Sequence, residues 1–173
     1  MEIKYQTVLN NNPVIKPTTG DFALVSYYSR DYTFILKPLT IDEIVNLETA
    51  YNNGNQFPAS LRELLFLAGQ LCYVLDYGLN GSQKEMQEDA REWLVDRELN
   101  IIMRPFFIID VHNGSSGFLF VYLDKGINDP IVYYADLDIN LDPDYPRLGS
   151  SQTTLSSFVN ARIDYLQRRI NPY

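Results

Sequence analysis

The sequence predicts a single α+β domain in which a mostly antiparallel or mixed β-sheet is covered by helices. Residues 40–69 and 82–99 repeat apolar residues at helical spacing, whereas residues 105–141 contain aromatic and β-branched runs typical of strands. Helical spacing returns after residue 154. A chain of 173 residues with 46% hydrophobic content fits one domain with a substantial core. We expect residues 1–38 to be an N-terminal extension of the domain that residues 39–173 form.

The N-terminal extension contains two short aromatic and β-branched runs, residues 22–28 and 32–38, separated by Ser-Arg-Asp. Such runs favour a strand hairpin. The chain starts without the basic and apolar regions of a secretion signal, and no apolar run reaches the length of about 18 residues that a membrane span needs. A single cysteine, Cys72, suits a reducing compartment. These features predict a cytoplasmic protein.

A first helix is predicted to begin after Thr40, because Thr40 and Glu43 have the spacing of a capping box. The sequence Asn-Asn-Gly at residues 52–54 is expected to end this helix. Four apolar or aromatic residues recur on its predicted buried face: Ile41, Ile44, Leu47 and Tyr51.

Two more helices follow. Pro58 is expected in the first turn of the second helix and Gly69 at its end. Its buried stripe is Leu61, Leu64, Leu65 and Ala68, widened by Phe66 and Leu67. A third helix is predicted to begin with a capping box of Ser82 and Glu85. Its inward residues are Met86, Ala90, Trp93 and Leu94, and its outer face is acidic, with Glu85, Glu88, Asp89, Glu92 and Asp96.

The strongest hairpin signal joins residues 105–112 to residues 118–124 through the sequence Asn-Gly-Ser-Ser-Gly. Both alternating sets of the second run are apolar, which predicts a central strand covered on both faces. We expect another strand over residues 131–141, a turn through residues 142–151, and a final helix. The final helix has an apolar face of Leu155, Phe158, Val159, Ile163, Leu166 and Ile170. Its cations, Arg162, Arg168 and Arg169, are interpreted as favourable charges at the negative end of the helix dipole.

The net charge of −8 argues against nucleic-acid binding, which depends on Lys and Arg neutralising phosphates. An acidic surface favours a basic protein partner, although plain solubility explains the charge equally well. No nucleophile–base arrangement is evident, and His112 is interpreted as a strand-end residue. Asp136, Asp138 and Asn140 have the spacing of a calcium loop, but Leu141 and Arg147 occupy its glycine and glutamate positions. We therefore expect no catalytic residues, no cofactor and no metal.

Acidic residues and tyrosines are concentrated in one stretch, which is the predicted partner-binding site. Carboxylates would steer a basic partner, and tyrosines would supply contact area with little loss of entropy. The alternative is a solvated sheet edge whose charges prevent edge-to-edge pairing. The outer face of the third helix is a second candidate, with a solvated face as its alternative. The site residues in the stretch are Asp124, Asp129, Tyr133, Tyr134, Asp136, Asp138, Asp142 and Asp144.

The sequence of residues 39–69 resembles the N-terminal part of the SUKH superfamily domain. This domain was first noted in fungal cell-wall-assembly regulators. The resemblance rests on an acidic Leu-Thr-x-x-Glu-Ile helix at residues 39–44, Phe57-Pro58 before the second helix, and a leucine ladder ending at Gly69. It extends to the apolar hairpin and to a Thr-Leu-Ser-Ser-Phe helix start at residues 154–158. Bacterial members resemble immunity proteins, which bind and neutralise toxins that are often nucleases.

The resemblance implies a non-catalytic immunity protein that binds a basic toxin through an acidic surface. Two alternatives stay open: an intracellular scaffold or regulatory binding domain without a toxin, as the fungal relatives suggest, and a hydrolase that uses two carboxylates. The sequence does not indicate an oligomeric state.

Overall fold

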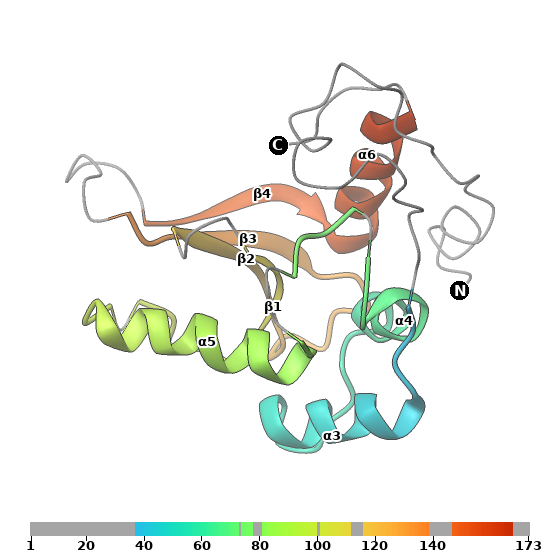
Figure 1. Ribbon diagram of the computed structural model, residues 1–173, viewed down its shortest axis with the longest axis horizontal. Coiled ribbons are helices and arrows are strands. Elements are labelled where there is room, and N and C mark those ends of the chain that lie inside the picture. Colours follow the sequence, from blue (N-terminus) through green and yellow to red (C-terminus); the bar gives the residue numbers. More distant parts are fainter. Residues whose placement is uncertain are drawn as a thin grey trace.

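The structure, a computed structural model, describes residues 37–72, 74–77, 81–99, 101–111, 116–138 and 147–167. These residues form an α+β domain of four helices and one four-stranded antiparallel sheet, as the sequence predicts (Figure 1). The helices are α3 (Ile41–Tyr51), α4 (Ala59–Ala68), α5 (Gln83–Asp96) and α6 (Leu155–Gln167). The strands are β1 (Phe106–Val111), β2 (Gly117–Tyr122), β3 (Ile131–Asp136) and β4 (Leu148–Thr154).

Helix α3 begins and ends where the sequence predicts. Thr40 and Glu43 form the capping box, and Asn52 is the C-cap, followed by Asn53 and Gly54 with φ angles of 53° and 77°. Such positive φ angles end a helix, and glycine adopts them without steric cost. The prediction of a buried Ile41 is wrong, because its side chain is 50% exposed. Leu39, which precedes the N-cap, is buried instead. Its N–H donates a hydrogen bond to Leu65 O.

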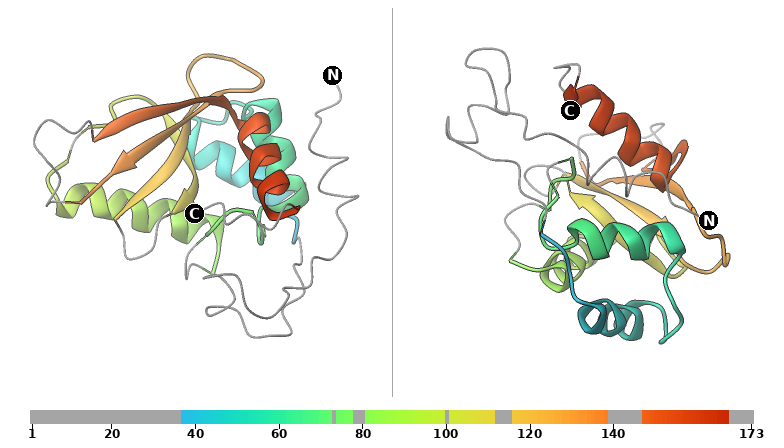
Figure 2. Two further views of the ribbon diagram at one scale, coloured as in Figure 1. Left: turned by 90° about the horizontal axis from the view of Figure 1, so that it is seen from above. Right: turned by 90° about the vertical axis from the view of Figure 1, so that its right-hand side faces the viewer.

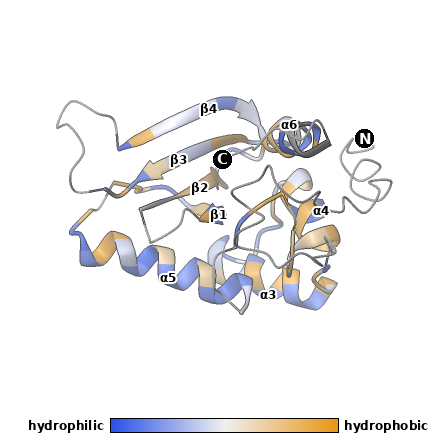
Figure 3. Cartoon of the chain, turned by 45° about the horizontal axis from the view of Figure 1, so that its top comes forward, coloured by the Kyte–Doolittle hydropathy of each residue, from blue (hydrophilic) through white to orange (hydrophobic). Residues whose placement is uncertain are grey.

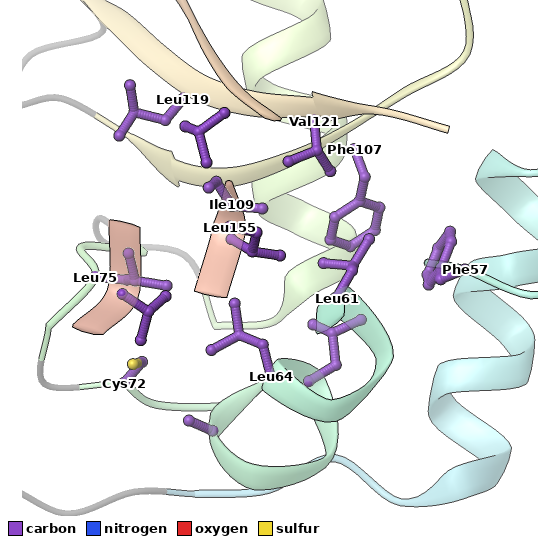
Figure 4. Close-up of a cluster of buried hydrophobic side chains, with 14 of the residues drawn as sticks. Phe57, Leu61, Leu64, Cys72, Leu75, Phe107, Ile109, Leu119, Val121 and Leu155 are labelled. Carbon is purple, nitrogen blue, oxygen red and sulfur yellow. The ribbon is translucent and has the colours of Figure 1, made fainter. Parts of the chain in front are cut away.

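Helix α4 is the apolar centre of the helical layer. All four residues of its predicted stripe are buried, and Gly69 is its C-cap. The expectation that Phe66 widens this buried face is wrong, since Phe66 is 46% exposed, whereas Leu67 packs against the core. The stripe alone therefore faces the sheet, where Leu61 and Leu64 meet Phe107 and Ile109 of β1 (Figure 4).

The sheet has the strand order β1–β2–β3–β4 and is covered on both faces (Figures 1 and 2). The β1–β2 hairpin is confirmed, with Phe107 opposite Val121 and Val111 opposite Phe118. Alternate residues of β2 enter two separate clusters: Leu119 and Val121 pack with α3, α4 and α6, whereas Phe118 and Phe120 pack with α5. This alternation confirms the predicted central strand with apolar cover on both sides.

Two predictions on the second half of the sheet are wrong. Strand β3 ends at Asp136, so Leu137 and Asp138 do not extend it, although Leu137 is buried. The segment from Leu148 to Thr154, predicted partly as a turn, forms β4, which pairs with β3 and is largely pale in Figure 3 because it is rich in Ser and Thr. A polar edge strand lacks the apolar alternation that identifies strands in a sequence.

Several predictions fall on residues outside the described part of the chain. These are residues 22–36 of the hairpin predicted over residues 22–38, His112, the predicted strand residues 139–141, and Arg168, Arg169 and Ile170.

Candidate functional site

The described residues of the predicted acidic site do not form one surface, and Asp124 is already paired within the chain. Asp124 follows β2 and forms a bidentate contact with Arg104, whose Nε and Nη2 lie 2.7 Å and 2.5 Å from its two carboxylate oxygens. These hydrogen bonds are the main cause that lowers the pKa of Asp124 and raises the pKa of Arg104. Both side chains keep their charges, and the carboxylate of Asp124 is already neutralised within the chain.

Asp129 binds the N-terminal turn of α6. Its two carboxylate oxygens accept hydrogen bonds from the backbone N–H and the hydroxyl of Ser156, at 3.0 Å and 2.5 Å. Helix N-termini carry free N–H groups and a partial positive charge, so a carboxylate there stabilises the helix. Asp129 therefore joins the β2–β3 turn to α6.

Tyr133 and Tyr134 lie on opposite faces of the sheet. Tyr133 packs on the α5 side, with its ring 4.8 Å from that of Tyr122, whereas Tyr134 packs on the side of α4 and α6. The ring of Tyr134 lies over Gly149, where an added Cβ would come within 2.1 Å of it. Because consecutive strand residues point to opposite faces, these two tyrosines cannot contact one partner surface together.

Asp136 and Asp138 lie at the other end of β3 from Asp124 and Asp129. Strand β3 runs from Ile131, which follows Asp129, to Asp136, and the five steps between its ends span about 17 Å at about 3.3 Å per residue. Asp136 Oδ1 accepts a hydrogen bond from the N–H of Asp138, which is exposed. Asp142 and Asp144 lie outside the described residues. The structure thus brings Asp136 and Asp138 together and keeps them apart from Asp124 and Asp129.

Helix α5 is held against the edge of the sheet by two polar side chains that the sequence reasoning missed. The amide of Gln87 pairs with both backbone groups of Ile108: Nε2 donates to Ile108 O at 2.7 Å, and Oε1 accepts from Ile108 N at 3.0 Å. Arg91 donates to Phe106 O at 2.8 Å and lies over the rings of Phe106 and Tyr51. The two side chains satisfy backbone groups of β1 that an edge strand leaves open. The only sequence signal was that polar Gln87 stands next to inward-facing Met86.

The opposite face of α5 is acidic and open to solvent. The helix alternates hydrophilic and hydrophobic residues along its length (Figure 3). Val95, which precedes Asp96 in the last turn of this helix, is 71% exposed. Of the nearby cations, Lys84 lies 3.6 Å from Glu88, and Arg91 is held against the sheet. Asp89 on this face is half-buried. The other four acids are exposed: Glu85, Glu88, Glu92 and Asp96.

A buried ion pair joins Arg162 of α6 to Asp110 of β1. Arg162 Nη1 of α6 donates to Asp110 Oδ2 at 2.5 Å and to Val74 O at 3.0 Å, and the N–H of Asp76 donates to Asp110 Oδ1 at 2.6 Å. Burial raises the pKa of Asp110 to about 7, although Arg162 opposes the rise. The interpretation of Arg162 as a cation that favours the negative end of the helix dipole is wrong, because Arg162 is buried and paired with Asp110.

This pair is suited to joining segments and not to chemistry. The Asp110 side chain is 0% exposed and both of its oxygens hold hydrogen bonds, so a substrate does not reach it in this conformation. Nearby Cys72 is also buried, and burial raises the pKa of its thiol to about 12. It packs as a small apolar residue, as predicted, and stays protonated at neutral pH. The ion pair ties α6 and residues 74–76 to β1.

Comparison with known proteins leaves the family open: no family model matches the chain, and neither a curated protein nor a solved structure matches it. Across the described residues, none of the helices has the length and apolar character to cross a membrane. The same residues contain no group of three or more His, Cys, Asp or Glu side chains placed to hold a metal ion.

Proposed function

We propose that this domain is a non-catalytic protein-binding domain of the immunity type, which binds a basic toxin domain through the outer face of α5. The observation that carries the proposal is the contrast between the two sides of this helix. One side is fixed to β1 by Gln87 and Arg91, and the other presents exposed carboxylates around Val95. The resemblance to the SUKH superfamily supports a toxin as the partner.

The proposed mechanism is steric and electrostatic. The net charge of −8 accelerates the encounter with a basic protein, and the carboxylates of α5 orient it. Val95, exposed in the last turn of α5, supplies an apolar contact beside the carboxylates. Because α5 is already held in place by its inner side, little conformational entropy is lost on binding. A stable complex of this type buries on the order of 1,600 Å² and would cover the substrate site of a toxin.

The test is co-expression with the product of the gene immediately upstream, where that gene encodes a toxin, followed by calorimetry on the purified complex. The variant Glu92→Lys/Asp96→Lys is compared with Asp136→Lys/Asp138→Lys, which changes the net charge by the same amount. We expect the α5 variant to weaken binding by about tenfold or more and to reduce its salt dependence. The sheet variant should change binding much less.

Each alternative result has a definite meaning. If the sheet variant has the larger effect, the assignment to α5 is wrong and the acids after β3 form the interface. If the two proteins bind but toxicity persists in cells, the immunity proposal fails and a regulatory binding domain is the better description. If the toxin does not bind at all, the proposal of a toxin partner is rejected.

A further inference from the structure

A second surface lies at the end of the sheet where β1 and β3 begin and β2 ends. We call it the aromatic surface and define it by Tyr122, Ile131 and Tyr133, with Arg104 and Asp124 at its margin. Ile131 and Tyr133 are two residues apart in β3 and so point to the same face of the sheet. The guanidinium of Arg104 lies 3.9 Å from the centre of the Tyr122 ring. Both tyrosines are half-buried, whereas Ile131 is 40% exposed.

Two further exposed apolar side chains belong to segments that adjoin this surface in the sequence. Met103, which precedes Arg104, is 85% exposed, and Ile127, in the turn between β2 and β3, is 48% exposed. Tyr, Arg and Met are enriched in the cores of protein interfaces. An exposed apolar group of this kind next to half-buried tyrosines indicates an interaction surface.

The aromatic surface carries no excess of negative charge, unlike the chain as a whole. Arg104 and Asp124 neutralise each other, and the cation Lys125 adjoins Asp124. Arg104 uses Nε and Nη2 on Asp124, which leaves Nη1 available to an acceptor on another molecule. The surface therefore presents both signs of charge side by side.

We propose that the aromatic surface joins two copies of this chain in a symmetric dimer, a property beyond the proposed binding of a toxin. A two-fold interface needs a patch that complements itself, and a patch with adjacent cations and a carboxylate does so. Two molecules with a net charge of −8 each repel one another, and this repulsion is smallest where the local surface has no excess of negative charge. A strongly basic partner gains no comparable attraction at a surface without an excess of negative charge.

Analytical ultracentrifugation of the full chain, from low micromolar to several hundred micromolar, tests the proposal. The mass should rise with concentration from 20.0 kDa toward twice that value. Association should strengthen with added salt, because salt screens the repulsion between two acidic chains. The double variant Met103→Glu/Ile131→Glu should raise the dissociation constant by about tenfold or more.

Two controls separate a surface effect from a folding effect. Met103→Glu alone changes a side chain that is 85% exposed, so it should fold normally and still weaken the dimer. Val95→Glu introduces the same charge at a residue that is 71% exposed on α5 and should leave the dimer intact. A monomer at every concentration would overturn the proposal. A dimer that persists in the double variant, or that Val95→Glu disrupts equally, would do so as well.

Discussion

Two arginine–aspartate pairs of this domain have the same chemistry in opposite surroundings. Arg162 and Asp110 lie 2.5 Å apart with side chains 8% and 0% exposed, and Arg104 and Asp124 lie 2.5 Å apart with side chains 37% and 34% exposed. In the buried pair, loss of hydration dominates and raises the pKa of Asp110. In the exposed pair, the hydrogen bonds to Arg104 dominate and lower the pKa of Asp124.

The comparison teaches that burial, and not distance, decides what an ion pair contributes. A buried pair joins elements that are distant in sequence, and either partner alone is costly there. An exposed pair adds little to folding because water and salt screen it. Four predictions test this conclusion on polar contacts of the domain, beginning with the most buried contact and ending with the most exposed.

The largest expected effect comes from Arg162→Met. The substitution keeps an unbranched side chain but removes the cation beside Asp110, whose side chain is 0% exposed. Removal of one partner from a buried ion pair typically lowers the free energy of unfolding by about 3–5 kcal/mol. Urea denaturation at pH 8 measures the loss. It should be smaller at pH 5, where Asp110 carries a proton in the folded protein.

A second variant distinguishes the unpaired charge from the loss of packing. Asp110→Asn combined with Arg162→Met leaves no buried charge and keeps an acceptor for the N–H of Asp76. We expect the double variant to be more stable than Arg162→Met alone. Equal losses in the two variants would show that the stem of Arg162, and not its charge, holds α6 to β1.

The pH dependence of stability is the next largest effect. The pKa of Asp110 rises from 3.8 to about 7 on folding, so the folded state binds a proton more tightly between these pH values. The free energy of unfolding should therefore fall as the pH rises from about 4 to about 7 and then level off. This rise in pKa is equivalent to about 4 kcal/mol at most.

Comparison with Asp110→Asn isolates this contribution, since the other carboxyl groups titrate alike in both proteins. Urea denaturation between pH 4 and pH 8 should give the wild type the steeper decline with rising pH. If the wild type instead gains stability relative to Asp110→Asn over this range, the attraction of Arg162 outweighs burial.

The sequence identified the elements that local patterns determine. The capping box at Thr40, the apolar stripe of α4 and the β1–β2 hairpin depend on neighbours within a few residues, and all three are confirmed. It missed β4, because an edge strand rich in Ser and Thr needs no apolar alternation. Strand β4 forms through its hydrogen bonds with β3, and no local sequence pattern indicates this pairing.

The sequence was a weaker guide to the candidate site. Arg162 and Asp110 are 52 residues apart, so no local pattern joins them. The described residues of the predicted acidic site do not form one surface, and strand geometry gives one reason. Tyr133 and Tyr134 are consecutive strand residues, which point to opposite faces. The acidic face of α5 was visible in the sequence, but its fixation through Gln87 and Ile108 was not.

Gln87→Met tests a buried contact that is polar but uncharged. The variant keeps the volume of the side chain and leaves the N–H and C=O of Ile108 without their partner. A buried backbone group that loses its hydrogen bond costs about 1–3 kcal/mol, so we expect a loss of about 2–3 kcal/mol. Hydrogen exchange at the Ile108 amide should accelerate. Lys84→Met, on the exposed side of the same helix, is the control, and an unchanged exchange rate at Ile108 would contradict the predicted clamp.

The smallest effect is expected at Arg104 and Asp124. A double-mutant cycle with Arg104→Ala and Asp124→Ala should give a coupling below about 1 kcal/mol, because both side chains are more than one third exposed. The coupling should shrink further in high salt. Arg104→Ala should cost slightly more than Asp124→Ala, since Arg104 also lies over the Tyr122 ring, a contact worth about 0.5–1 kcal/mol at exposed sites. The cycle is measured on the monomer at low concentration, where association between chains does not contribute. A coupling as large as that of the buried pair would mean that bidentate geometry, and not burial, governs both pairs.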